Sequence, residues 1–226
     1  MQQSSATHSP MSELFTHPAI GAEGIEVARG ATLYTQGATA EHLYYIHRGQ
    51  IRLYQVGPDG EERLADILGP GQWFGCSSLS DQTQYVAQAV AATEAQLSRM
   101  AARNLLAHIA TNPQAALAII RQLATSVRTA REDAARLQFQ DCNHRLVDAM
   151  LRFSSSAAAT VQGSDIVLHL THEQLAQAVG AARETVSLAL TEMRHKNLVR
   201  TGRNRLIFNR EELRASLNGH AVQPVA

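Results

Sequence analysis

Basic side chains are concentrated in residues 171–210. Seven arginine or lysine residues stand there against three glutamates, a local charge of +4 in a chain whose formal net charge is zero. The basic residues are Arg183, Arg194, Lys196, Arg200, Arg203, Arg205 and Arg210. Cations gathered in this way suit contacts to nucleic-acid phosphates, which supply most of the affinity in such complexes. A run of charged residues is more often an ordinary solvated surface. The secondary structure that carries these charges must therefore show whether they form a nucleic-acid-binding surface.

These charges lie on a pattern of two helices joined by a glycine and followed by a hairpin. Thr171 and Gln174 predict a capping box at the start of the first helix. Gly180 supplies the positive φ needed in a tight turn between two helices. We expect the second helix to span about residues 182–195, with a wing of strands 198–200 and 206–208 around the basic turn 201–205. The inward-facing residues should be Leu175, Ala176, Val179, Val186, Leu190 and Met193. This order of elements is typical of a winged helix-turn-helix and favours DNA binding.

Residues 25–100 show short apolar runs punctuated by glycine at intervals of about 8–12 residues, as in an antiparallel sandwich or small barrel. The sequence PDG at Pro58–Gly60 predicts a hairpin turn, because proline presets φ and glycine accepts a positive φ. We interpret this region as a β-roll. Residues 1–18 are expected to form a flexible lead, with a short helix around 11–15.

A heptad pattern follows the roll. Its seam residues are spaced alternately four and three apart, and they are Ala116, Ile120, Leu123, Val127, Ala130, Ala134 and Leu137. Such a seam is typical of a helix that pairs with its own copy, although a helix packed on its own roll is the alternative. We expect a parallel homodimer. Beyond it, Asp141 is the expected N-cap of a helix over 142–153, residues 154–164 a loop, and 166–170 a strand.

Composition excludes several classes. Cys76 and Cys142 are too few for a four-thiolate iron–sulfur cluster or zinc site, and they do not suggest a disulfide framework. No export signal or apolar run long enough to cross a membrane is visible, so we expect a cytoplasmic protein. The ten histidines are scattered, without the G-x(5)-H-x-H cluster of a cupin-like metal enzyme, and no hydrolase or P-loop motif occurs. We expect no catalytic residues and no metal site.

The order of these parts, with D-x-x-x-R-L at 141–146 and ARETVSLAL at 182–190, resembles the CRP/FNR family of bacterial transcription regulators over about residues 20–215. The resemblance implies an α+β fold: a cyclic-nucleotide-binding-like antiparallel β-roll (19–110), a dimerisation helix (111–139) and a winged helix-turn-helix domain (140–226). It also implies double-stranded DNA, a second copy of the chain and RNA polymerase as partners. Two copies would read a palindrome in consecutive major grooves.

In this family the positions of Arg183 and Glu184 read a G·C pair and its neighbour in a TGA-type half-site. The chemistry agrees, because arginine donates two bonds to guanine and glutamate accepts from a cytosine amine. Thr185 matches a phosphate contact, and Ser187 resembles the anaerobic branch. Leu188 departs from the pattern, which has arginine, so we expect a TGA-like core with altered flanking preference. The expected DNA-binding residues are Thr171, His172, Arg183, Glu184, Thr185, Ser187, Arg194, Lys196, Arg203 and Arg205.

The segment GQWFGCSSLSDQTQYVAQAV at 71–90 aligns with the family's phosphate-binding cassette. Cys76, Val86 and Ala87 replace its glutamate and its arginine–serine pair, and no lysine or arginine occurs between Arg63 and Arg99. A buried phosphate would lack a partner there, so we do not expect cyclic AMP. The expected effector pocket comprises Phe74, Gly75, Cys76, Ser77, Ser78, Tyr85, Val86, Ala87, Val127, Ala130 and Arg131.

The sequence allows effectors other than a cyclic nucleotide. The sequence of residues 85–97 resembles that of family members that sense nitric oxide through haem, or that sense 2-oxoglutarate. If this chain bound haem, the candidate ligands would be Cys76, His47 and His108. A thiol switch at Cys142 near a helix N-terminus is another alternative. A third is the absence of any effector. A dimeric cupin-like sensor or scaffold without DNA binding is the alternative from a different class.

Overall fold

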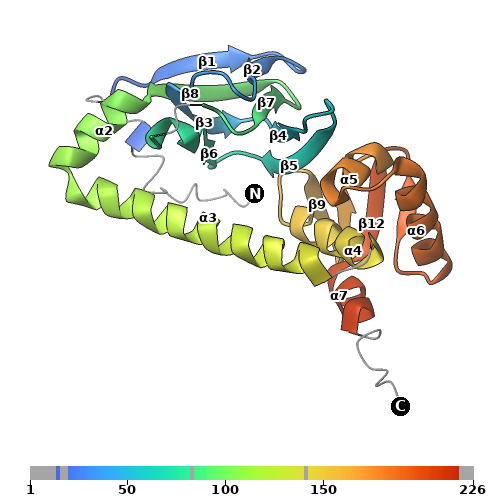
Figure 1. The fold of residues 1–226 in the computed structure, drawn as a ribbon. Helices are drawn as coiled ribbons and strands as arrows, with labels where there is room; N and C mark the ends of the chain where they lie inside the picture. The colour runs from blue at the N-terminus through green and yellow to red at the C-terminus, as the bar shows by residue number, and fades with distance from the viewer. Residues whose placement is uncertain (1–13, 16–19, 82–83, 140–141, 219–226) are drawn as a thin grey trace. The chain divides into compact units, whose positions relative to one another are not determined.

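The computed structural model describes residues 14–15, 20–81, 84–139 and 142–218, with side chains for all of these except residues 129 and 132–139. The chain divides into two compact units. The first contains the residues up to Leu53 together with Leu68–Arg131, and the second contains Tyr54–Ile67 and the residues from Glu132 onward. Figure 1 shows the β-strands of the N-terminal half, the long helix that follows them and the mixed C-terminal half.

The N-terminal half is an antiparallel β-roll. Its strands form two four-stranded sheets with the orders β1-β8-β3-β6 and β2-β7-β4-β5 (Figure 1). The strands are β1 (Glu23–Val27), β2 (Thr32–Tyr34), β3 (His42–Arg48), β4 (Ile51–Val56), β5 (Glu62–Leu68), β6 (Trp73–Phe74), β7 (Gln88–Ala91) and β8 (Ala95–Ala101). Fully buried Ile46, Ile51 and Leu97 lie in one hydrophobic cluster of the roll. The roll predicted from the glycine-punctuated runs is confirmed.

The turn between β4 and β5 contains the PDG sequence, as predicted. The amide of Gly57 donates to the carbonyl of Glu61 at 2.8 Å, and Gly60 has a φ of 80°. Gly49, which links β3 to β4, has a φ of 93°, and a Cβ there would lie 2.3 Å from the carbonyl oxygen of Glu94. The chain therefore requires glycine at this second turn for space as well as for conformation.

Two helices follow the roll: α2 (Ala102–Thr111) and the 27-residue α3 (Pro113–Phe139). Near its start, α3 buries Ala115 and Ile119 in a cluster that also contains Leu43, Met100 and Leu105. Leu14 and Phe15, the part of the expected N-terminal helix that is described, are helical and belong to the same cluster. The long helix predicted from the heptad pattern is confirmed.

The C-terminal half is a winged helix-turn-helix. Its elements are α4 (Cys142–Phe153), β9 (Ala159–Gln162), β10 (Asp165–Leu168), α5 (His172–Val179), α6 (Arg183–His195), β11 (Arg200–Gly202), β12 (Arg205–Asn209) and α7 (Arg210–Asn218). The strand order is β11-β12-β10-β9. One core joins Leu146, Met150 and Phe153 of α4 to Val179 of α5 and Leu190 of α6. The α+β fold class is thereby confirmed.

Three local expectations need correction, and the first is the strand expected at 166–170, which is β10 at Asp165–Leu168. Strand β9 lies inside the segment 154–164 that the small, polar sequence presented as a loop, and it forms because all four of its residues pair with β10. The first wing strand, β11, lies two residues later than expected, and β12 extends one residue beyond the expected bounds at each end, with Gly202 opposite Arg205. Helix α7 was not expected, and Asp141, the expected N-cap of α4, lies outside the described residues.

Candidate functional site

The start of α6 presents polar side chains to solvent and the opposite face enters the core. Val186, Leu190 and Met193 are buried, as predicted. Arg183, Glu184 and Thr185 in the first turn are exposed. The helix therefore offers an arginine, a carboxylate and a hydroxyl side by side at its N-terminal end, a set that can bond to base edges and phosphates.

Helix α5, which precedes α6, has well-defined hydrogen bonding and backbone geometry at both of its ends. Thr171 accepts a hydrogen bond from the amide of Gln174 at 3.1 Å, and the Gln174 side chain accepts from the amide of Thr171 at 3.0 Å. This is the predicted capping box. Gly180 ends α5 in the left-handed region, with a φ of 63°. Local residues therefore fix both ends of α5, and Gly180 makes the turn into α6.

His172 and Ser187 connect the two helices through their side chains. Nδ1 of the histidine lies 3.0 Å from Oγ of the serine. Burial, helped by the positive charge of Arg183, holds the pKa of His172 below its usual value. The neutral ring is therefore the form that the folded domain favours near pH 7. Thr191, one turn beyond, donates its hydroxyl to the carbonyl of Ser187.

The seven basic residues of this segment divide into two groups. Arg200 forms an ion pair with Asp165, and Arg210 donates to the carbonyl and hydroxyl oxygens of Ser154. These two arginines hold the sheet and the loop after α4. Arg200 is nevertheless exposed, as are the other five, which are Arg183, Arg194, Lys196, Arg203 and Arg205. All five belong to the residues expected from the sequence to bind DNA.

The heptad seam of α3 is exposed along most of its described length. Ile120 is 58% exposed and Val127 is 50% exposed, while Ala116 and Leu123 are half-buried and Ala130 is exposed. The side chains of Ala134 and Leu137 lie outside the described residues. A row of exposed apolar side chains on a long helix is the kind of surface that a second helix covers.

The segment 71–90, which aligns with the family's phosphate-binding cassette, contains a tight turn. Polar groups of this turn bond to one another. Gly75 has a φ of 89°, and a short 3-10 helix, Cys76–Leu79, follows it. The hydroxyl of Ser78 donates back to the Gly75 carbonyl at 2.8 Å. Val86 is 66% exposed, whereas Ala87 is buried. The three α3 residues expected at the pocket are also exposed, and they are Val127, Ala130 and Arg131.

An aromatic cluster inside the roll, formed by Tyr34, Tyr44, Phe74 and Tyr85, was not foreseen. Tyr34 stacks on Tyr85 with ring centroids 3.6 Å apart, and Tyr44 stacks on Phe74 at 5.1 Å. Burial raises the pKa of all three tyrosines, so their phenols stay protonated at neutral pH. Phe74 and Tyr85 were expected in the effector pocket, but the pattern of the sequence did not join them to Tyr34 and Tyr44.

Tyr85 fastens this cluster to the backbone of β3. Its hydroxyl donates to the carbonyl of His42 at 2.9 Å and accepts from the amide of the same residue at 3.2 Å. Both polar directions of the phenol are thus used within the roll. A side chain that reaches a strand 43 residues away is a tertiary feature, which no local signal in the sequence reveals.

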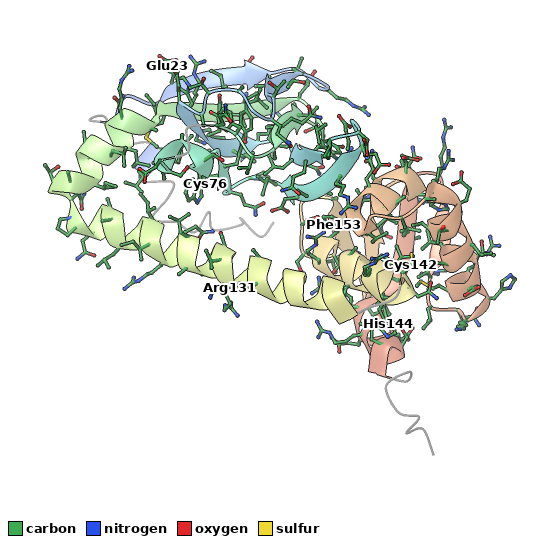
Figure 2. The ribbon with its side chains drawn as sticks, in the orientation of Figure 1. Glu23, Cys76, Arg131, Cys142, His144 and Phe153 are labelled. Carbon is green, nitrogen blue, oxygen red and sulfur yellow. The ribbon has the colours of Figure 1, made fainter. Side chains whose placement is uncertain are left out.

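The candidate ligands for haem and thiol chemistry lie on separate elements. His47 on β3 is bonded through Nε2 to Ser98, and Nε2 of His108 on α2 lies 3.2 Å from the Asn112 amide. Figure 2 shows Cys76 in the roll and Cys142 at the start of α4, and both are free thiols. The Cys76 side chain reaches solvent, yet burial of its sulfur raises the pKa of the thiol.

The described part of the chain lacks both a metal-binding cluster and a membrane-spanning helix. No group of three or more histidine, cysteine or carboxylate side chains in it is placed to hold a metal ion. None of its helices combines the length and the apolar character needed to cross a bilayer.

Comparison with known proteins agrees with this geometry. Residues 25–112 match the cyclic nucleotide-binding domain, and residues 144–216 match the Crp-like helix-turn-helix domain. A CRP-like cAMP-activated global transcriptional regulator of Mycobacterium tuberculosis is 32% identical over 84% of this chain and 85% of its own length. The cyclic AMP receptor protein of Thermus thermophilus is 31% identical over 77% and 78% of the two chains.

A solved structure shows the same fold. A CRP-family transcriptional regulator from Thermus thermophilus superimposes with a TM-score of 0.72, at 26% identity, over 89% of this chain and all of the other. This Thermus protein and the relative from Mycobacterium tuberculosis are both transcriptional regulators. With a helix-turn-helix whose first turn is exposed and polar, and with this similarity along most of its length, the chain belongs to the CRP/FNR family of DNA-binding transcription regulators.

Proposed function

We propose that the protein acts as a homodimer that reads a TGA-type palindrome through Arg183 and Glu184. The observation that carries this proposal is the exposure of both side chains in the first turn of α6, whose opposite face is anchored in the core. Rigid support matters here because a side chain reads a base only when its own helix is held in place. The core residues behind α6 and the capped α5 supply that support.

Each residue of the first turn has a partner chemistry in the major groove. Arg183 donates two hydrogen bonds to guanine O6 and N7, and Glu184 accepts one from a cytosine amine. Thr185 bonds to a phosphate. The exposed basic residues at the end of α6 and in the wing add sequence-independent attraction to the backbone. Arg200 and Arg210 are left out of this role because their guanidinium groups are already bonded within the domain.

Dimerisation follows from the exposed seam of α3. Two copies paired along Ile120 and Val127 bury apolar side chains that are about half exposed in one chain. A two-fold axis along this helix pair relates the two copies of α6. Their half-sites then form an inverted repeat separated by about one turn of DNA.

The sensor domain, in this proposal, does not take a cyclic nucleotide. The relative from Mycobacterium tuberculosis is a cAMP-activated regulator. In this chain the cassette has Val86 and Ala87, and the roll contains the stacked pair Tyr34–Tyr85. No cationic side chain occurs between Arg63 and Arg99 to neutralise a phosphate. The packed aromatic rings lie inside the roll, and this favours a domain that folds without a phosphate-bearing ligand.

Fluorescence anisotropy with a labelled palindromic duplex tests the proposal. We expect tight binding that weakens steeply with salt, a loss of roughly tenfold or more for Arg183→Ala, and no change on adding cyclic AMP. Arg214→Ala is the matched control, since Arg214 is an exposed arginine of the same domain on α7. The proposal fails if binding ignores sequence, or if both substitutions have the same effect.

A further inference from the structure

Leu188 on α6 is an exposed apolar residue on a surface that is otherwise polar. It is 64% exposed, while the apolar residues on either side of it in the sequence, Val186 and Ala189, are buried. Leucine is costly to leave in water, and Leu188 does not belong to the hydrophobic core cluster of this domain. A role in binding accounts for its position better than a role in the core.

The position of Leu188 on the helix places it with the residues that face DNA in the proposed function. It follows Glu184 by four residues, so the two side chains share one face of α6, one turn apart. Its neighbour Ser187 is held by the hydrogen bond to His172. Leu188 is therefore at the centre of the outward face, next to a fixed polar group and one turn beyond a carboxylate.

A leucine cannot exchange hydrogen bonds with a base, so it cannot read donors and acceptors. The apolar feature that a base pair presents in the major groove is the C5-methyl group of thymine. We propose that Leu188 is a specificity-determining residue that recognises a thymine methyl group in or beside the TGA-type half-site. This inference rests on the proposed function, because it needs α6 to lie in the major groove.

Removal of individual thymine methyl groups from the DNA tests the inference. The best palindrome is first selected on the full-length protein from duplexes with two TGA-type half-sites and randomised flanks. Each thymine is then replaced by deoxyuridine, symmetrically in both half-sites, which removes the methyl group and keeps every hydrogen-bonding atom. At one thymine position we expect binding to weaken about fourfold per half-site, the worth of one buried methyl group.

The Leu188→Ala variant is the decisive control, and its exposed position lets the domain fold normally. It should bind the thymine and deoxyuridine duplexes equally well at that position, with Arg183-dependent recognition unchanged. Placing 5-methylcytosine there should restore part of the wild-type affinity relative to cytosine. Leu188→Arg should change the preferred base from thymine to guanine, because arginine bonds to O6 and N7.

Two failures are distinguishable. If the protein selects no palindrome and Arg183→Ala has no effect, the proposed function is wrong and the inference falls with it. If the palindrome is bound but no deoxyuridine position depends on Leu188, the proposed function stands and the thymine contact is overturned. An equal deoxyuridine effect in the wild type and in Leu188→Ala also overturns it, since the methyl group would then act through DNA shape or another residue.

Discussion

The Nδ1 atom of His172 lies 3.0 Å from the Oγ atom of Ser187, which links the first turn of α5 to the outward face of α6. Figure 1 shows these two helices side by side in the C-terminal half. The bond couples a titratable ring to a residue next to Leu188 and one turn from Arg183. The protonation of His172 therefore bears on the residues proposed to meet DNA.

This link predicts that acid destabilises the DNA-binding domain through His172. The folded state lowers the pKa of this ring, so below about pH 6.5 the unfolded chain takes up the proton more readily. Stability is present above that pH and is lost as the pH falls. We expect the melting temperature to drop between pH 7 and pH 5, and to drop less for His172→Asn. Equal drops in both proteins would contradict the prediction.

Removal of Tyr85 should leave a hole in the roll that a small phenol can fill. Tyr85→Ala deletes the ring stacked on Tyr34, at an expected cost of about 3–5 kcal/mol. Adding p-cresol should raise the melting temperature of this variant and leave the wild type unchanged. Tyr85→Phe keeps the ring and loses the two bonds to His42, for about 1–3 kcal/mol. Absence of rescue would show that the site collapses.

Alkaline conditions should destabilise the same cluster. Burial raises the pKa values of Tyr34, Tyr44 and Tyr85, so the folded roll favours the neutral phenols. Their contribution is fully present below about pH 10, the usual pKa of tyrosine, and is lost as the pH rises above it. Chemical denaturation from pH 8 to 11 should show this loss, with tyrosinate absorbance appearing at unfolding. Ionisation of all tyrosines in the folded protein near pH 10 would refute it.

Charged substitutions on the seam should separate the dimer. Ile120→Asp or Val127→Asp places a carboxylate at the centre of the proposed helix pair, and sedimentation should then report a monomer with weakened palindrome binding. Val161→Asp is the control, because Val161 is an exposed valine (72%) that belongs to β9 and not to the seam helix. A dimer that survives both seam substitutions would place the interface elsewhere.

Two turn glycines offer a matched pair of substitutions in the roll. Gly60→Ala meets no atom within 4 Å, so its cost is the left-handed backbone alone, about 1–2 kcal/mol. Gly49→Ala has the same strain and also places Cβ 2.3 Å from the Glu94 carbonyl oxygen. Denaturant titration should find Gly49→Ala clearly the less stable of the two. Equal stabilities would show that the strand after Thr93 moves freely.

The sequence predicted those elements whose signals are local. The capping box of Thr171, the glycine at 180 and the apolar face of α6 defined the helix-turn-helix because each depends on residues within one turn. Strand β9 escaped prediction because its residues are weakly patterned and form a strand only by pairing with β10. The ring cluster escaped for the same reason, since Tyr34 and Tyr85 meet only through the tertiary fold.

The partners of the basic residues also depend on the tertiary fold, so a count of charges along the sequence does not reveal them. Arg200 and Arg210 looked equivalent to their neighbours, but their partners, Asp165 and Ser154, lie 35 and 56 residues away. The charge count alone therefore does not show which of the seven cations are bonded within the domain.

The capping box of α5 also determines whether the Thr171 hydroxyl can still donate or accept a further hydrogen bond. A hydroxyl has one hydrogen to donate and two lone pairs to accept with, and the helix cap consumes acceptor capacity only. The hydrogen stays available, and it is the half of the group that an anion can use. Thr171→Asp would cap the helix equally well while presenting only negative charge. The same substitution would therefore separate the helix cap made by Thr171 from the DNA contact that the sequence predicts for it.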